Sequence, residues 1–308
     1  MSRLHEALAD YLSVRRAMGY KLERAGKLLA QFVDYLDGID VTTVTIEHAL
    51  AWATLPTKGG NNWWSLRLSV VRGFATYLSS IDPATEIPPS DLLPERNKRA
   101  TPYLYSEEEI AALLTATEIL KGPLRTATYR TLLGLLAVTG LRIGEAIRLN
   151  RGDLDVRAGL LMVRSTKFGK DRQVPLHPTT TAALAGYLEL RDRHFPHPDT
   201  TAVFISTAGT RLLYCNVNWT FLKLVDRAGL TPRSGSCRPR IHDLRHSFAV
   251  NTVLDGYRTG ADVQARLPLL STYLGHIDPA NTYWYLSAAP ELLALAGRRL
   301  EDHLEGDR

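Results

Sequence analysis

The chain contains little cysteine and no long apolar segment. Its two cysteines, Cys215 and Cys237, form neither a Cys-x-x-Cys pair nor a ligand cluster. This scarcity argues against a disulfide framework and favours a reducing compartment. No run of ~18 apolar residues predicts a membrane span, and the first seven residues, Met-Ser-Arg-Leu-His-Glu-Ala, lack the apolar core of a signal peptide. We therefore expect a cytoplasmic protein without a membrane partner.

Neither sign of charge dominates the sequence. The 37 Lys and Arg residues exceed the 32 Asp and Glu residues by five, and the pI is about 9.2. This moderate excess permits a polyanionic partner without requiring one. A length of 308 residues is enough to bury a substantial core in one large or two ordinary domains. We expect two.

Apolar residues at helical spacing predict four helices near the start of the chain, over residues 4–18, 22–37, 45–53 and about 64–80. Four helices of this length make a small α-helical domain. The first two have basic polar faces with Arg15, Arg16, Lys21, Arg24 and Lys27. Such a face can lie on DNA phosphates, although a charged helix face is more often just solvated. The sequence leaves both interpretations open.

Prolines and the basic trio Arg96, Lys98 and Arg99 mark a linker within residues 82–104. We place the domains at residues 1–85 and 105–308, joined by a linker at 86–104. The second domain opens with Ser106 and Glu109, whose spacing fits a capping box.

The second domain is predicted to be mainly helical with one small antiparallel sheet. We predict a β-hairpin formed by residues 160–166 and 172–177, with Gly169 in its turn. Pro175 implies that the second strand lies at an edge of the sheet. A further short strand is predicted near 202–206. Helices are expected at about 107–118, 124–139, 179–192, 216–228, 242–254, 262–274 and 290–304.

Arg142 lies in the segment Thr139-Gly-Leu-Arg-Ile-Gly-Glu145, at the predicted start of a helix. The glycine before it lets the backbone approach a ligand closely, and helix N-terminal amides favour an anion. Glu145, one turn later, can orient the arginine or be an ordinary surface charge.

Lys167 lies at the tip of the predicted hairpin, with Lys170 and Arg172 close behind. Lysines at such tips often serve solubility alone. Lys170 is the alternative candidate if the register of the hairpin slips.

His242 and Arg245 lie three residues apart on a predicted helix, so both side chains project from one face and can meet one phosphate. His242 and His246 also have the spacing of a zinc pair, but Asp243 stands where zinc proteases carry glutamate, and no third ligand follows. The structural alternative is a solvated helix start, with Asp243 favoured by the helix dipole.

The last motif is Gly275-His276, followed nine residues later by Tyr285. A Gly-His pair after a helix is by itself a simple C-cap. Tyr283 and Tyr285 are both candidates in this segment; the family resemblance given below makes one of them a nucleophile and, through the interval of nine residues and the pattern Thr282-x-x-Tyr285, favours Tyr285.

Taken in order, these motifs resemble the tyrosine recombinases of the phage integrase class, over residues ~105–290. The resemblance implies a SAM-like helical core-binding domain before an α+β catalytic domain with a C-terminal exchange helix. It also implies a site-specific DNA recombinase: the integrase or transposase of a mobile element, or a resolvase. Its partners would be double-stranded DNA and three further copies in a homotetramer, at the nucleoid. The residues that carry the resemblance are Arg142, Lys167, His242, Arg245, His276 and Tyr285.

The resemblance also assigns roles. Two guanidinium forks, Arg142 and Arg245, would stabilise the charge on the scissile phosphate, and His276 would hydrogen-bond it. His242 would act as the base for Tyr285, because a tyrosine pKa near ~10 is too high for attack at neutral pH. Lys167 would protonate the departing 5′-oxygen. The 3′-phosphotyrosine intermediate retains the bond energy, so no cofactor is expected.

Two other functions stay open. A type IB-like topoisomerase shares the nucleophile chemistry but rejoins the same strand. A DNA-binding regulator would keep the fold without the chemistry, although the complete set of six residues argues against it.

Overall fold

The computed structural model describes residues 2–57, 60–93, 100–164 and 171–276, together with residues 278, 282 and 297. The chain divides into two compact units, residues 1–99 and 100–308. This division falls inside the segment predicted as a linker. Within the described residues, no helix is both long and apolar enough to cross a membrane.

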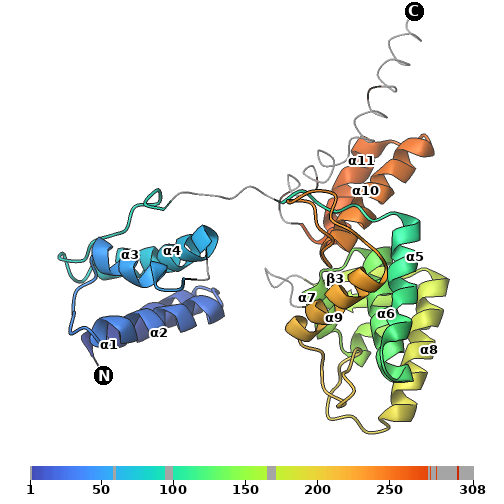
Figure 1. Cartoon of the computed structure of the whole chain (residues 1–308), viewed down its shortest axis with the longest axis horizontal. Coiled ribbons are helices and arrows are strands. Elements are labelled where there is room, and N and C mark those ends of the chain that lie inside the picture. The colour runs from blue at the N-terminus through green and yellow to red at the C-terminus, as the bar shows by residue number, and fades with distance from the viewer. Residues whose placement is uncertain are drawn as a thin grey trace, which may run out of the picture. The chain divides into compact units, whose positions relative to one another are not determined.

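The N-terminal unit is a bundle of four helices (Figure 1), which confirms the helices predicted there. Thr45 caps the third helix by accepting a hydrogen bond from the backbone N of His48 at 3.2 Å. The core contains Phe32, Trp52 and Phe74, all fully buried or nearly so. The helices are α1 (Arg3–Ala17), α2 (Glu23–Asp37), α3 (Ile46–Thr54) and α4 (Gly60–Leu78).

Basic side chains cover part of the outside of α1, α2 and the connection between them. Arg16, Lys21, Arg24 and Lys27 are exposed. The Arg24 guanidinium lies 4.9 Å from the ring centroid of Trp63, a cation–π distance that limits the freedom of the arginine without neutralising it. The unit therefore presents positive charge to solvent.

The C-terminal unit is built around α6, which contacts α5, α7, α8 and α10. The predicted capping box of α5 is confirmed: Glu109 N donates to Ser106 Oγ at 3.2 Å and Ser106 N to the Glu109 carboxylate at 2.9 Å. The helical elements are α5 (Glu107–Ala116), η1 (Thr117–Ile119), α6 (Pro123–Thr139), α7 (Ile143–Arg148), η2 (Arg151–Asp153), α8 (Pro178–His194), α9 (Tyr214–Arg227), α10 (Asp243–Arg258) and α11 (Val263–Leu274).

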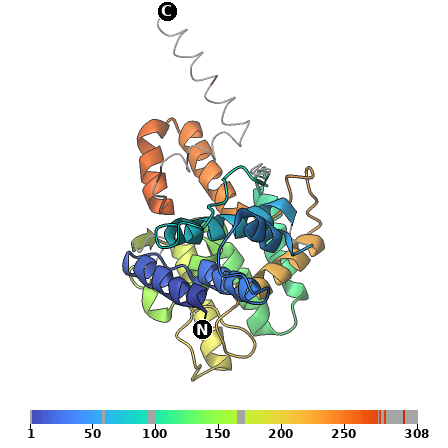
Figure 2. The same ribbon diagram turned by 90° about the vertical axis from the view of Figure 1, so that its left-hand side faces the viewer.

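Helices α10 and α11 lie side by side (Figure 2) and share a small core of their own. That core is formed by Val250, Val253, Leu254, Val263, Leu267 and Leu270 among others. Because α10 also packs on α6, the pair brings the end of α11 to the end of α6. This junction holds most of the residues discussed below.

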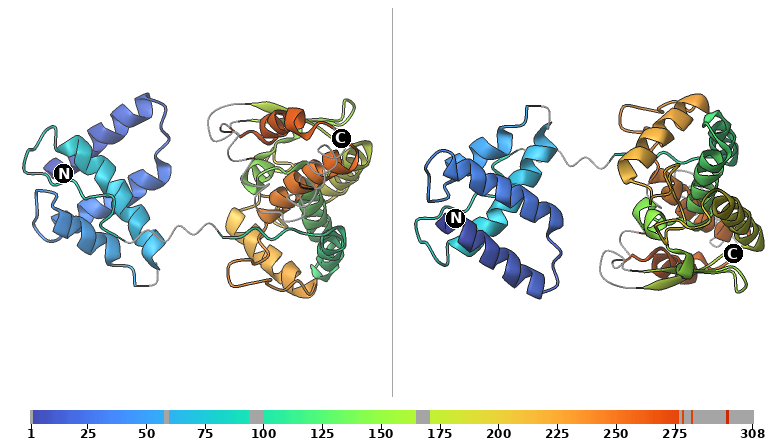
Figure 3. Two further views of the ribbon diagram at one scale, coloured as in Figure 1. Left: turned by 90° about the horizontal axis from the view of Figure 1, so that it is seen from above. Right: turned by 90° about the horizontal axis from the view of Figure 1, so that it is seen from below.

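The sheet is small and antiparallel, with β1 (Leu154–Asp155), β2 (Leu160–Val163) and β3 (Arg172–Pro175) in that order. The predicted hairpin and the edge position of Pro175 are confirmed. The turn, including Gly169, lies outside the described residues. Figure 3 shows the strands next to α11, and α11 contacts β3. The fold class predicted from the sequence, mainly α with a small antiparallel sheet, is confirmed.

The strand predicted near 202–206 is wrong, because Ala202 and Ile205 form isolated bridges rather than a strand. This apolar segment is buried but does not pair along its length with a described strand. Isolated hydrogen bonds satisfy its backbone instead: Val203 N donates to Leu149 O at 2.9 Å, and Arg191 Nη2 donates to Ala202 O at 2.9 Å. Strand β1 was not predicted, since two residues carry no periodic pattern. The helix predicted over 290–304 lies outside the described residues.

Candidate active site

A tight turn between α6 and α7 places Arg142. Gly140 ends α6 with φ +59°, and a Cβ there would lie 2.5 Å from a ring carbon of Phe248. The position therefore requires glycine for both its conformation and its space. Arg142 follows as the N-cap of α7, and its backbone N donates to the Glu145 carboxylate at 3.0 Å.

Glu145 is shared by two arginines. Its side chain is 2% exposed, and it accepts from Arg142 Nη1 at 2.8 Å and from Arg172 Nη1 and Nη2 at 3.2 and 2.8 Å. Burial raises the pKa of Glu145, but the hydrogen bonds and charges of Arg172 and Arg142 outweigh burial and lower it to about 2. Glu145 is thus a buried, ionised orienting group, and the alternative of an ordinary surface charge is wrong.

Arg172 was seen in the sequence only as one more charge near a hairpin tip. In the structure its side chain is 12% exposed, and its Nε donates to the carbonyl of Tyr273 at 2.9 Å. A signal for this was present, since Arg172 lies two residues before the buried Val174 on β3, and side chains two residues apart on a strand point to the same face. Its partners on α7 and α11 are not local in sequence, so only the fold reveals them.

Arg245 is 1% exposed on α10. Its Nη1 donates to Gly140 O at 2.7 Å, and its Nη2 donates to Leu274 O at 2.7 Å and lies 2.9 Å from His276 Nε2. One guanidinium thus joins α10 to the ends of α6 and α11. The alternative of a solvated helix start is wrong, because Asp243, Arg245 and His246 are all buried.

His276 follows Gly275, which caps α11 in the left-handed conformation at φ +69°. A guanidinium can only donate, so Nε2 of His276 accepts from Arg245 and its Nδ1 carries the proton. Nδ1 lies 2.8 Å from Thr282 Oγ1. The Gly-His pair is therefore a helix cap, and Arg245 fixes the tautomer of the histidine.

His242 lies at the N-cap of α10. His242 is exposed at the surface, so its ring is only partly desolvated. This desolvation and then the charges of Arg245 and Arg142 lower its pKa to about 4. The same causes lower the pKa of His276 to about 4. Both imidazoles are neutral at pH 7, but Nε2 of His276 already accepts from Arg245, so His242 is the one suited to accept a proton.

His242 and His246 pack edge to face with ring centroids 5.1 Å apart. Nε2 of His246 lies 3.7 Å from Asp243 Oδ1. The part of the chain that the structure describes contains no group of three His, Cys, Asp or Glu side chains that would hold a metal ion.

Four of the six residues predicted from the sequence therefore come together, at the α6–α7 turn, the start of α10 and the end of α11. They are Arg142, His242, Arg245 and His276, and we call them the Arg-His cluster. Lys167 and Tyr285, and their rivals Lys170 and Tyr283, lie outside the described residues.

The model of the phage integrase family matches residues 104–291, which include the whole Arg-His cluster. The chain belongs to the phage integrase family. This confirms the resemblance seen in the motifs and makes the chain a tyrosine recombinase.

Two curated relatives agree with this membership. This chain is 44% identical over 311 residues to the integrase/recombinase y4rB of Sinorhizobium fredii, and the match covers 99% of each chain. It is 30% identical over 226 residues to the tyrosine recombinase XerC of Chlamydia trachomatis, covering 73% of this chain and 67% of XerC.

Solved structures of recombinases share its fold. The Tn1549 transposon integrase in complex with transposon right-end DNA matches with a TM-score of 0.64 and 17% identity, covering 98% of this chain and 99% of that one. A lambda integrase tetramer bound to a Holliday junction matches with a TM-score of 0.61 and 18% identity, over 92% and 76% of the chains.

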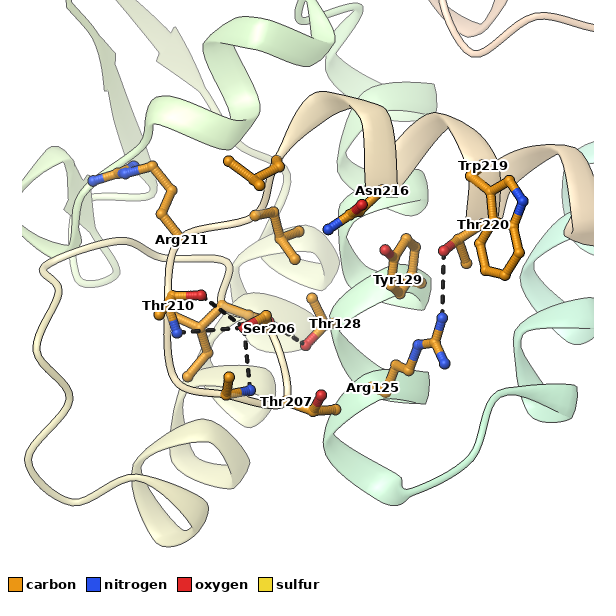
Figure 4. Close-up of a pocket in the computed structure, with 14 residues that line it drawn as sticks. Arg125, Thr128, Tyr129, Ser206, Thr207, Thr210, Arg211, Asn216, Trp219 and Thr220 are labelled. Carbon is orange, nitrogen blue, oxygen red and sulfur yellow. Dashed lines mark hydrogen bonds between the residues drawn. The ribbon is translucent and has the colours of Figure 1, made fainter.

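This tyrosine recombinase also has a hollow of about 480 Å³ between α6, α9 and residues 205–213 (Figure 4). Of the described residues that line it, only Arg125 and Arg211 are charged. Arg125 donates to Thr220 Oγ1 at 3.4 Å, and Arg211 points out of the hollow to Ile147 O at 2.8 Å and Asn150 Oδ1 at 2.6 Å. The hollow contains no member of the Arg-His cluster. We place the candidate active site at the cluster, because that is where histidines with strongly lowered pKa values and convergent arginines meet.

The lowered histidine pKa values predict acid sensitivity. Between pH 6.5 and about 4 the unfolded chain binds protons at His242 and His276 that the folded protein does not. The free energy of unfolding should therefore fall as the pH drops through this window. Urea unfolding at pH 7, 6 and 5 measures the slope. A variant with both His242→Gln and His276→Gln should show a shallower slope, and an unchanged slope would contradict the assignment.

Proposed function

We propose that this protein cuts and rejoins duplex DNA at a specific site through a 3′-phosphotyrosine formed by Tyr285. The observation that carries the proposal is the convergence of Arg142, His242, Arg245 and His276 from three separate elements. Convergence of this kind is what phosphoryl transfer requires, since the transition state is stabilised by donors fixed in advance.

Arg142 is suited to hold the scissile phosphate. Its side chain is 32% exposed, so the guanidinium is anchored on Glu145 yet reaches solvent. Its second anchor, Gly275 O, lies at 3.3 Å from Nη2, a long hydrogen bond that leaves room for adjustment. Glu145 pairs with Arg142 and Arg172, while Arg245 binds backbone carbonyls and His276. The three arginines therefore leave an excess of positive charge, which favours a phosphodiester.

His242 is suited to act as the base. In the free protein its pKa is lowered to about 4, in part by Arg245 and Arg142. A bound phosphate offsets the charge of those arginines, so DNA binding raises this pKa toward the range in which a base works at neutral pH. Arg245 contributes from the buried side, where it orients His276 beside the phosphate.

Lys167 is proposed to protonate the departing 5′-oxygen. It belongs to the segment that joins β2 to β3, and β3 contacts α11. A lysine surrounded by other cations has a lowered pKa, which makes it a better acid at neutral pH.

Residues 1–85 are proposed as the core-binding domain, joined by a linker over 86–104 to a catalytic domain at 105–308. The exposed basic residues of α1 and α2 support a DNA contact by the first domain. The protein would act on the nucleoid, in the cytoplasm.

We further propose a homotetramer that synapses two DNA sites. A hollow of about 650 Å³ lies between residues 101–108 and α10, and its lining includes Leu104, Val250, Leu254, Glu107 and Glu108. The leucine-rich segment 290–304, which carries Arg298 and Arg299, has the apolar and basic groups to fill it from a neighbouring copy. The lambda integrase structure is a tetramer on a Holliday junction.

The test is covalent trapping. Incubation with fragmented host DNA carrying nicks should leave DNA attached to the protein after denaturation, also in excess EDTA, because the proposed donors are arginines and not a metal ion. Sequencing the attached DNA identifies the site. No adduct would favour a DNA-binding regulator, and a strict need for Mg²⁺ would contradict the proposed mechanism.

The recovered site separates recombination from topoisomerase activity. We expect recombination between two marked sites, with four protomers in the native complex that carries both. Relaxation of a plasmid lacking the site, without recombination, would identify a type IB-like topoisomerase instead.

A further inference from the structure

We propose that Arg172 is a positioning residue that locks the β2–β3 hairpin to Arg142 and to the Gly275-His276 turn. The proposal rests on the proposed function and adds to it a residue that does not itself touch DNA. It concerns how three elements that carry the chemistry are held in one arrangement.

Arg172 forms hydrogen bonds to two neighbouring elements, α7 and α11. Its two Nη atoms donate to the two carboxylate oxygens of Glu145 at 3.2 and 2.8 Å, and its Nε donates to Tyr273 O at 2.9 Å. Glu145 in turn binds both the backbone N and the side chain of Arg142. The chain of bonds therefore runs from β3 through Glu145 to Arg142, and from β3 directly to the end of α11.

The Arg172 guanidinium packs closely against the backbone of Gly275. A Cβ at Gly275 would lie 2.9 Å from Arg172 Nη1 and 3.2 Å from Arg172 Cζ. The plane of Arg172 thus packs against bare backbone one residue before His276. Arg142 Nη2 donates to the carbonyl of the same glycine at 3.3 Å, so both arginines meet at this turn.

Only arginine fits these contacts. A lysine has the charge but no planar fork, and it cannot meet both carboxylate oxygens and a carbonyl on a third element at once. Because Arg172 is the first residue of β3, the same contacts fix the base of the hairpin whose connecting segment carries Lys167. Loss of the fork should therefore displace Arg142 and His276 without removing either.

Three variants test this. Arg172→Lys keeps the charge, Arg172→Gln removes it, and Arg164→Gln is the matched control. Arg164 lies just after β2 in the same hairpin and also forms ion pairs, with Asp153 at 2.7 Å and Asp171 at 3.9 Å, but its side chain is 55% exposed. Neither of those carboxylates binds a member of the Arg-His cluster in the described residues.

The rate of single-turnover cleavage of the trapped site should fall about 100-fold in both Arg172 variants. This is the loss of rate expected when a catalytic group is displaced by about 1 Å. The Kd for DNA should change less than about threefold, because the lost contacts act on the reacting geometry rather than on binding. Arg164→Gln should cleave like wild type. Wild-type cleavage by either Arg172 variant would overturn the proposal, and full activity of Arg172→Lys alone would show that charge and not geometry matters.

A second substrate separates positioning from a general loss of structure. A neutral methylphosphonate at the scissile position carries less charge, so it depends less on correctly placed guanidinium groups. The Arg172→Gln defect should shrink to less than about fivefold on this substrate. An equal defect on both substrates, together with a lowered Tm, would show a merely structural role and overturn the proposal.

These outcomes are distinct from failure of the proposed function. If wild-type protein forms no covalent adduct with either substrate, the proposed function fails and Arg172 has no reaction to position. If wild type forms the adduct and the Arg172 variants match it, only the inference about Arg172 fails.

Discussion

Tyr285→Phe is expected to abolish the covalent protein–DNA adduct. Phenylalanine lacks the oxygen that attacks phosphorus, so the rate should drop by at least about 10⁴-fold. DNA binding should persist, because one lost hydrogen bond of about 1 kcal/mol changes Kd by about fivefold at most. Denaturing gels of the trapped complex measure the adduct, and a gel-shift titration measures Kd.

Tyr283→Phe is the matched control, two residues away in the same segment. It should form the adduct at close to the wild-type rate. The opposite pattern, with adduct in Tyr285→Phe and none in Tyr283→Phe, would make Tyr283 the nucleophile. Loss of DNA binding in Tyr285→Phe would leave the chemical role unsupported.

Arg245→Lys is expected to impair both stability and cleavage. The Arg245 guanidinium donates hydrogen bonds to Gly140 O, Leu274 O and His276 Nε2, and the residue is 1% exposed. A lysine ammonium cannot reach all of them, and each buried acceptor left unpaired costs about 1 to 3 kcal/mol. Tm should drop by about 3 to 10 °C, and cleavage by about 10² to 10³-fold.

Arg142→Lys should instead reduce cleavage with little effect on stability. The Arg142 side chain is 32% exposed, and Glu145 keeps its bonds to Arg172. The loss in unfolding free energy should therefore stay below about 1 kcal/mol. Differential scanning calorimetry and single-turnover cleavage compare the two variants. Equal losses of stability, or wild-type cleavage by Arg245→Lys, would contradict the buried role assigned to Arg245.

Local sequence determined much of this protein. Apolar spacing predicted the helices because a helix must turn one face to the core, and Ser106 with Glu109 marked a helix start because a capping box needs only four residues. Gly140, Arg142 and Glu145 could also be interpreted together, since their contacts lie within one turn of chain. The order of the motifs then indicated the family.

Tertiary structure decided what lies between distant segments. Arg172 and Glu145 are 27 residues apart, and Arg172 and Tyr273 are 101 apart, so no spacing rule could have paired them. Burial was equally hidden: the sequence left a solvated helix start open as the alternative for residues 242–246, but Asp243, Arg245 and His246 are covered by the packed helices.

By itself, the sequence determined most of the helices and the β2–β3 hairpin, because periodicity and capping depend on near neighbours. Only the tertiary structure decided which carbonyls Arg245 serves, that one carboxylate holds two arginines, and that His242 and His276 are neutral at pH 7. Desolvation and charge interactions depend on groups brought close in space, and several of those groups come from distant segments: Arg172 is 27 residues from Glu145, and Gly275 is 133 residues from Arg142.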